Sequence, residues 1–94
     1  MPDNFFFTDY ITYLDVEEGL SPNTIEAYMH NVGRYISYLT EHDITSPIGV
    51  TKDIVTGYIE YLRDNGLSAN SIARNFSALR SFHKFLYREQ KVPA

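Results

Sequence analysis

The sequence predicts an all-α fold in which four helices form two packed helical hairpins. Apolar residues recur at the 3.6-residue spacing of an amphipathic helix in four stretches, and the period-two alternation of a strand is absent. The second half of the chain also repeats the first. The predicted helices run from about Phe6 to Glu18, from Ser21 through Leu39, from Thr51 through Leu62, and from Ser68 to about Gln90.

Residues that favour helix ends mark these boundaries. Ser21, Thr51 and Ser68 can each accept a hydrogen bond from a backbone N–H group of the first turn that has no partner within the helix. Gly19 and Gly66 stand where a helix C-terminus commonly needs a left-handed residue.

Each predicted helix carries one apolar stripe, and we expect the four stripes to form the core. The stripes consist of Phe6, Tyr10, Tyr13 and Leu14; Ile25, Met29, Val32, Ile36 and Leu39; Ile54, Val55, Tyr58, Ile59 and Leu62; and Ile72, Phe76, Leu79, Phe82 and Leu86.

The internal repeat joins the helices into hairpins. Residues 19–39, GLSPNTIEAYMHNVGRYISYL, align with residues 66–86, GLSANSIARNFSALRSFHKFL, at a shift of 47 positions with six of 21 residues identical. Two copies are too few for a solenoid, which needs at least three stacked units. We therefore expect one four-helix domain over residues 1–94.

Several classes of protein are excluded by what the sequence lacks. It has no cysteine, no run of about 18 apolar residues and no basic N-terminal segment of a secretory signal, so we expect a cytoplasmic domain that does not enter a membrane. His30, His42 and His83 do not have the spacing of metal ligands, and no glycine-rich phosphate loop or nucleophile elbow occurs. We expect no metal and no cofactor, and we expect His83 at the edge of the core, where it finds a hydrogen bond.

The net charge of −4 conceals an uneven distribution. Residues 1–65 carry three basic and eleven acidic side chains, a net charge of −8, whereas residues 66–94 carry five basic and one acidic, a net charge of +4. Charge asymmetry of this kind indicates an anionic partner such as a nucleic acid. The alternative is that the cations only neutralise the acidic part of the domain.

The basic residues of the last helix fall on the face opposite its apolar stripe. This polar stripe contains no acid and suits a polyanion, since small residues permit close approach and cations face phosphates. Ser68, Asn70 and Ser71 also surround a helix N-terminus without a carboxylate, which is a ready phosphate site. The stripe comprises Asn70, Arg74, Ser77, Ser81, Lys84 and Arg88, and its counterpart in the second helix comprises Asn23, His30, Arg34 and Ser37, diluted by Glu26 and Glu41.

The strings LSPNTIEAY, YISYL, VTKDIVTGYIEYL and GLSANSIARNFSALRSFHKFL together resemble the N-terminal core-binding domain of the tyrosine recombinases, the phage-integrase and Xer-type enzymes. The resemblance covers roughly residues 6–90. It implies a SAM-like four-helix fold that forms one half of a clamp around double-stranded DNA.

The resemblance also implies a division of labour. In this family a separate C-terminal domain carries the arginine, histidine and nucleophilic tyrosine that cut and rejoin DNA, and the chain stops at KVPA, near where a Pro-containing linker leads into it. We therefore expect a non-enzymatic part of a DNA-breaking and rejoining recombinase. Its partners would be double-stranded DNA, its own C-terminal catalytic domain and other recombinase protomers on DNA.

DNA-facing residues are implied at the starts and outer faces of the second and fourth helices. The matching positions are Ser21, Thr24, Tyr28, Ser68, Ser71 and Arg74, with Arg80 beside the stripe, where it could instead support the fold. With the stripe residues, the predicted DNA-binding set is Ser21, Asn23, Thr24, Tyr28, Arg34, Ser68, Asn70, Ser71, Arg74, Ser77, Arg80, Ser81, Lys84 and Arg88.

A second function remains open, because SAM-like folds also serve as protein-interaction or self-association modules. Phe5, Phe6 and Phe7 could supply an apolar contact surface, or two of them could pack inside while the third seals the first helix. An independent enzyme is the third alternative, and no catalytic constellation favours it.

Overall fold

The computed structural model describes residues 4–92, which form four α-helices and a short 3₁₀ turn. These residues contain no strand, so the all-α prediction is confirmed. Pro93 and Ala94 of the KVPA sequence lie outside the described residues. The elements are α1 (Phe7–Val16), α2 (Pro22–Glu41), η1 (Pro47–Gly49), α3 (Lys52–Asp64) and α4 (Ala69–Arg88).

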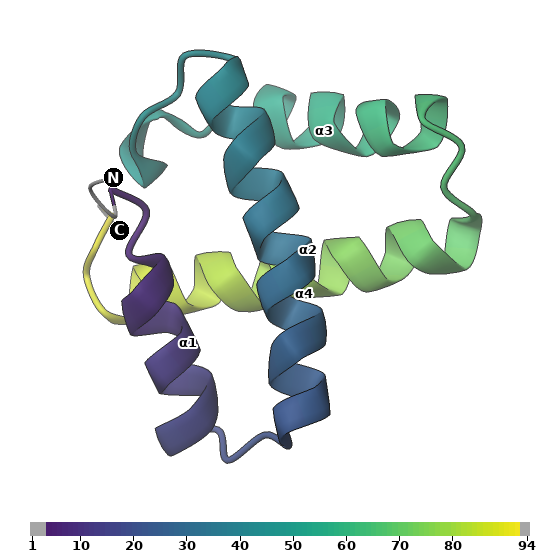
Figure 1. Ribbon diagram of the computed structural model, residues 1–94. Helices are drawn as coiled ribbons and strands as arrows, with labels where there is room; N and C mark the ends of the chain where they lie inside the picture. Colours follow the sequence, from purple (N-terminus) through teal and green to yellow (C-terminus); the bar gives the residue numbers. More distant parts are fainter. Residues whose placement is uncertain (1–3, 93–94) are drawn as a thin grey trace.

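The helices form the two expected hairpins, and the hairpins pack through α2 and α4. Figure 1 shows α1 beside the first half of α2, α3 beside the first half of α4, and α2 crossing in front of α4. Among the helix pairs, α2 and α4 make the most extensive contact. No helix of residues 4–92 is long and apolar enough to cross a bilayer.

The predicted helix boundaries are close to those observed, and the predicted caps are present. The side-chain oxygens of Ser21, Thr51 and Ser68 accept hydrogen bonds from the backbone N–H three residues later, at 3.2–3.3 Å. Gly19 and Gly66 have φ angles of 61° and 86°, the left-handed conformation that reverses the chain after α1 and α3. Helix α1 ends two residues before the predicted Glu18, and α4 ends two residues before Gln90.

Aromatic rings bind the hairpins together in the core. The Tyr10 ring of α1 meets the Phe82 ring of α4 edge to face at 5.1 Å, and the Tyr35 ring of α2 lies 5.0 Å from that of Tyr58 in α3. These geometries are the favoured ones for aromatic pairs. The largest fully buried side chains are Tyr10, Leu14, Val32, Tyr35, Leu39, Tyr58, Leu62, Leu79, Phe82, Phe85 and Leu86.

Two residues predicted to lie in the core are substantially exposed. Met29 is 40% exposed and Phe76 is 43% exposed, and they occupy equivalent positions of the two repeats. Asn75 and Phe85 of α4 are buried instead. The prediction of a single apolar stripe assumes that each helix packs on one flat surface. Helix α4 is instead contacted from several sides by α1, α2 and α3. Its buried arc is therefore rotated away from Phe76.

The N-terminal phenylalanines pack against the core. Phe5 is 5% exposed, and Phe6 and Phe7 are half-buried against the core cluster. None of the three offers the exposed surface that a self-association site built on them requires.

Candidate nucleic-acid interface

The crossing of α2 and α4 creates a hollow beside the first turns of α4. In Figure 1, α1 lies on one side of α2, and the N-terminal half of α4 extends on the other side with α3 above it. Between the middle of α2 and this half of α4 lies a hollow of about 250 Å³. We call it the α2–α4 corner; it is lined by His30, Asn31, Arg34, Leu67, Ser71, Arg74 and Asn75.

Two arginines from different hairpins line this corner, and no carboxylate does. Arg34 Nη2 donates to His30 Nε2 at 3.1 Å, and Arg74 Nη2 donates to Ser71 Oγ at 3.2 Å. Within residues 4–92 the recorded salt bridge joins Arg63 to Asp64 at 4.0 Å, so neither corner arginine has an acidic partner there. The two positive charges repel each other, and an anion in the hollow would relieve this repulsion.

The N-termini of both α2 and α4 are free of acidic residues in their first turns. Ser21 and Ser68 each cap one backbone N–H, and their hydroxyls also bond to those of Thr24 and Ser71 at 2.9 and 3.2 Å. The remaining N–H groups and the helix dipole give each terminus a partial positive charge. Both termini therefore favour an anionic ligand.

Asn75 is a corner residue that the sequence analysis missed. It is only 4% exposed; its Nδ2 donates to the Ser71 carbonyl oxygen at 2.8 Å, while its Oδ1 has no partner. The sequence offered one indication of Asn75, namely a polar residue directly after Arg74. Its burial follows from the orientation of α4, which the sequence does not give. His30 and Asn31 also line the corner, and neither belongs to the predicted DNA-binding set.

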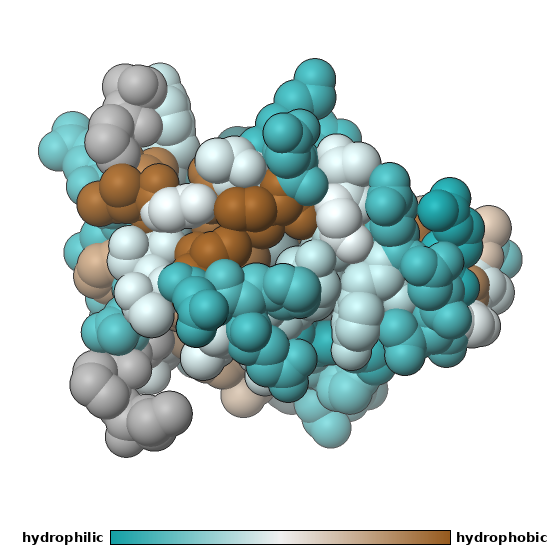
Figure 2. All heavy atoms as spheres, turned by 90° about the horizontal axis from the view of Figure 1, so that it is seen from above, coloured by the Kyte–Doolittle hydropathy of each residue, from teal (hydrophilic) through white to brown (hydrophobic). Residues whose placement is uncertain are grey.

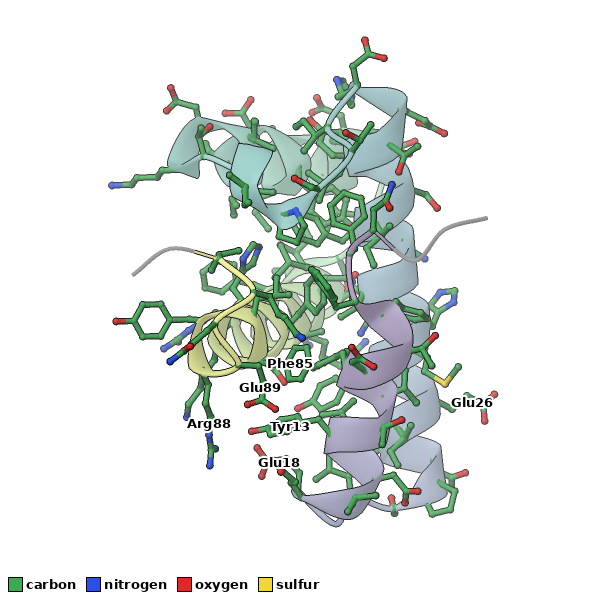
Figure 3. The ribbon with its side chains drawn as sticks, turned by 90° about the vertical axis from the view of Figure 1, so that its left-hand side faces the viewer. Tyr13, Glu18, Glu26, Phe85, Arg88 and Glu89 are labelled. Carbon is green, nitrogen blue, oxygen red and sulfur yellow. The ribbon has the colours of Figure 1, made fainter. Side chains whose placement is uncertain are left out.

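The predicted basic stripe of α4 is divided by the fold. Arg74 reaches the corner, whereas Arg88 turns to α1, where it donates to the Tyr13 hydroxyl at 3.4 Å beside Glu18 (Figure 3). Asn70, Ser77, Arg80 and Lys84 are exposed. The exposure of Arg80 favours a surface role over one in supporting the fold.

Ser81 was predicted to lie on the exposed polar stripe of α4, but it does not lie there. It is half-buried, and its Oγ lies 2.8 Å from the Tyr10 hydroxyl. This contact joins α4 to α1.

The predicted residues of α2 are distributed from its N-cap to Arg34, past its midpoint. Ser21, Asn23 and Thr24 are exposed at the helix start, while Tyr28 and Arg34 are half-buried. Burial raises the pKa of Tyr58 to about 12, and the positive charge of nearby Arg34 acts in the opposite direction.

His83 lies where the sequence analysis placed it, at the edge of the core. Its Nε2 is 2.8 Å from the Tyr35 hydroxyl, and burial lowers its pKa. Its ring is therefore an uncharged partner in the packing of α2 on α4. No group of three or more metal-ligating side chains occurs among the described residues.

The pattern of the phage integrase N-terminal SAM-like domain matches residues 7–90. The chain belongs to this family. It is 40% identical to tyrosine recombinase XerD of Staphylococcus aureus strain N315 over 82 residues, and 37% identical to tyrosine recombinase XerD of Oceanobacillus iheyensis over 83 residues. Each alignment covers 87% of this chain and 28% of the relative. No solved structure shows a significant match.

The family match confirms the resemblance found in the sequence and the SAM-like all-α fold. The chain spans little more than a quarter of the length of the curated relatives it matches.

Proposed function

We propose that this phage-integrase-type domain binds double-stranded DNA along α2 from its N-terminus to Arg34 and across the N-terminal half of α4. The observation that carries the proposal is the α2–α4 corner, where Arg34 and Arg74 converge from separate hairpins without a carboxylate between them. The acid-free N-termini of the two helices add further partial positive charge.

The residues on this surface suit contacts to the DNA backbone. Arginine, serine, asparagine and helix N-termini are the groups that commonly bond to phosphate oxygens, and such contacts fix the register of a protein on DNA. Arg80 and Lys84 continue the positive surface along the exposed side of α4. Apart from Glu26 and Glu41 on α2, the acidic side chains lie on other elements, for example Asp9 and Asp15 on α1, and would be repelled from DNA.

We assign to the domain a holding role within a tyrosine recombinase. Its relatives carry that name, and the matched region is 28% of their length. On this proposal the strand cutting and rejoining belong to a C-terminal catalytic domain, with which this domain encloses the duplex in the cytoplasm. Other protomers on the same DNA complete the assembly.

The test is a titration of the isotope-labelled domain with a short duplex, followed by NMR at low and high salt. We expect a dissociation constant on the order of 10⁻⁴–10⁻⁶ M and a steep loss of affinity with salt. Shift changes should lie at the corner and at the starts of α2 and α4. Changes confined to α1 and α3, or an affinity that salt does not alter, would contradict the proposal.

A double Arg34→Ala/Arg74→Ala variant makes the test specific. It should weaken binding to all sequences alike and reduce the slope of log affinity against log salt by about 1 if the two arginines share one phosphate, and by about 2 if each contacts its own. Arg63→Ala is the matched control, since Arg63 is exposed on α3 and lies beside Asp64.

The self-association alternative retains one supporting observation. A hollow near η1 is lined by Pro47, Ile48, Val50 and Val55, with Ile48 67% exposed, and the view from above shows apolar side chains gathered on this face (Figure 2). Light scattering tests it: oligomers that grow with concentration in the absence of DNA would favour an interaction module.

A further inference from the structure

We propose that the α2–α4 corner binds a single phosphate group, held between the guanidinium groups of Arg34 and Arg74. The inference rests on the proposed DNA-binding function and specifies it: the corner takes one backbone phosphate and not a base. The two arginines come from different hairpins, so the bound phosphate would link α2 to α4.

The positive charge of the corner favours an anion of this kind. Two guanidinium groups line a hollow of about 250 Å³ whose seven lining residues include no carboxylate. A guanidinium offers paired N–H donors that match the oxygens of a phosphate, and two of them can approach one tetrahedral group from opposite sides.

The present hydrogen bonds of the arginines leave most of their donors unused. Arg34 donates one N–H to His30 and Arg74 donates one to Ser71, each to a neutral partner within a turn of its own helix. A guanidinium has five N–H donors and no acceptor. Both side chains can therefore exchange a neutral partner for an ionised one, and charge-assisted bonds of that kind are about twice as strong.

Asn75 provides the second, independent observation. It lines the corner with its side chain 96% buried, and its Oδ1 lacks a partner while its Nδ2 is fixed to the Ser71 carbonyl. Buried polar atoms without partners are rare and each requires an explanation. An ionised phosphodiester cannot donate to this oxygen, whereas an arginine that turns into the corner can. On this account Asn75 accepts an N–H from the arginine that grips the phosphate.

Inorganic phosphate is the probe for this site, with sodium chloride at equal ionic strength as the reference. NMR of the isotope-labelled chain follows the arginine Nε–H signals. We expect the Arg34 and Arg74 signals and the Asn75 side-chain amide to follow one saturable curve, while Arg63 and Arg80 do not saturate. Arg34 and Arg74 signals that respond no more than those of Arg63 and Arg80 would overturn the proposal.

Coupling between the hairpins is the sharper test. Arg34→Gln should weaken the response of Arg74 to phosphate at least tenfold, and Arg74→Gln should do the same to Arg34. Arg80→Gln, a change of the same type on the exposed face of α4, should leave both responses intact. Independent responses of Arg34 and Arg74 would show that no single phosphate joins them.

The outcome separates this inference from the proposed function. Duplex binding without a saturable phosphate response would refute the phosphate site and leave DNA binding standing. A phosphate response without duplex binding would refute the DNA function. A titration with adenosine and cytidine, which carry bases but no phosphate, addresses the competing occupant: corner shifts with these and not with phosphate would refute the inference.

Discussion

The hydroxyl of Tyr35 lies 2.8 Å from Nε2 of His83, and this hydrogen bond joins the middle of α2 to the C-terminal half of α4. The two rings also meet edge to face at 5.6 Å. Tyr35 is fully buried, so the contact satisfies a hydroxyl that water cannot reach. Burial disfavours the charged form of the His83 ring and lowers the pKa of that histidine.

Acid should therefore destabilise the domain through His83. Below its ordinary pKa of 6.5 the unfolded chain takes up a proton that the folded domain resists, so the free energy of unfolding falls as the pH falls from 6.5 toward the lower folded pKa. Urea denaturation across this range measures the effect. His83→Gln should flatten the dependence and His42→Gln, at an exposed position, should not; equal slopes in the two variants would contradict the assignment.

Alkali should destabilise the domain through buried tyrosines. Burial raises the pKa of Tyr10 and Tyr58 to about 12, and it raises that of Tyr35 as well. As the pH rises above 10, tyrosines of the unfolded chain ionise first, so the free energy of unfolding decreases until the folded pKa values are reached. The tyrosinate absorbance of these three buried tyrosines, the last part of the total, should appear together with the loss of helical circular dichroism. Ionisation of all eight tyrosines before unfolding would show this expectation wrong.

Three tyrosine-to-phenylalanine changes should have effects of opposite sign. The hydroxyls of Tyr10 and Tyr35 have partners, whereas the buried Tyr58 hydroxyl has none. Tyr10→Phe and Tyr35→Phe should each lower the free energy of unfolding by about 1 kcal/mol, and Tyr58→Phe should raise it by about 1 kcal/mol. Thermal and urea denaturation of the three variants side by side tests this, and a destabilised Tyr58→Phe would indicate that its hydroxyl has a partner such as buried water.

The serine caps of α2 and α4 should contribute similar amounts to stability. Removal of either hydroxyl leaves a first-turn N–H without its acceptor, so Ser21→Ala and Ser68→Ala should each cost about 1 kcal/mol. Ser77→Ala, on the exposed middle of α4, should change stability by less than about 0.5 kcal/mol. If Ser77→Ala destabilised the domain as much as the cap variants, the loss could not be attributed to the capping hydrogen bonds.

Truncation of apolar side chains should distinguish the real core from the predicted one. Leu39→Ala and Leu86→Ala empty fully buried positions and should each cost about 2–5 kcal/mol. Met29→Ala and Phe76→Ala remove partly exposed side chains and should cost about 1 kcal/mol or less. Unfolding free energies from denaturant titrations provide the measurement, with large losses at Met29 or Phe76 as the contrary result.

Local signals accounted for most of the fold. Caps at Ser21, Thr51 and Ser68 and left-handed glycines at Gly19 and Gly66 depend on the backbone near them, and each was predicted correctly. The burial of Asn75 and the exposure of Phe76 depend on the angle at which α4 crosses its neighbours. No local sequence pattern determines that angle, so the predicted apolar stripe of α4 was wrong at these two positions.

The sequence predicted individual residues of the candidate site but not that they lie together. The sequence placed Arg34 and Arg74 on separate polar stripes, and nothing in either stripe indicates that they line the same hollow. Their convergence follows from tertiary packing of α2 on α4. Packing of α1 against α4 gave Ser81 a partner in Tyr10 and turned Arg88 toward Tyr13.

Because the two hairpins together form the corner, binding can be lost while the helices remain. Neither hairpin alone contains both arginines, so a partly denatured state that keeps its helices but loosens the α2–α4 packing would lack the site. Such a state retains its far-ultraviolet circular dichroism. Ligand affinity would then decline before helicity does, and a binding assay would report native tertiary order more sensitively than helix content.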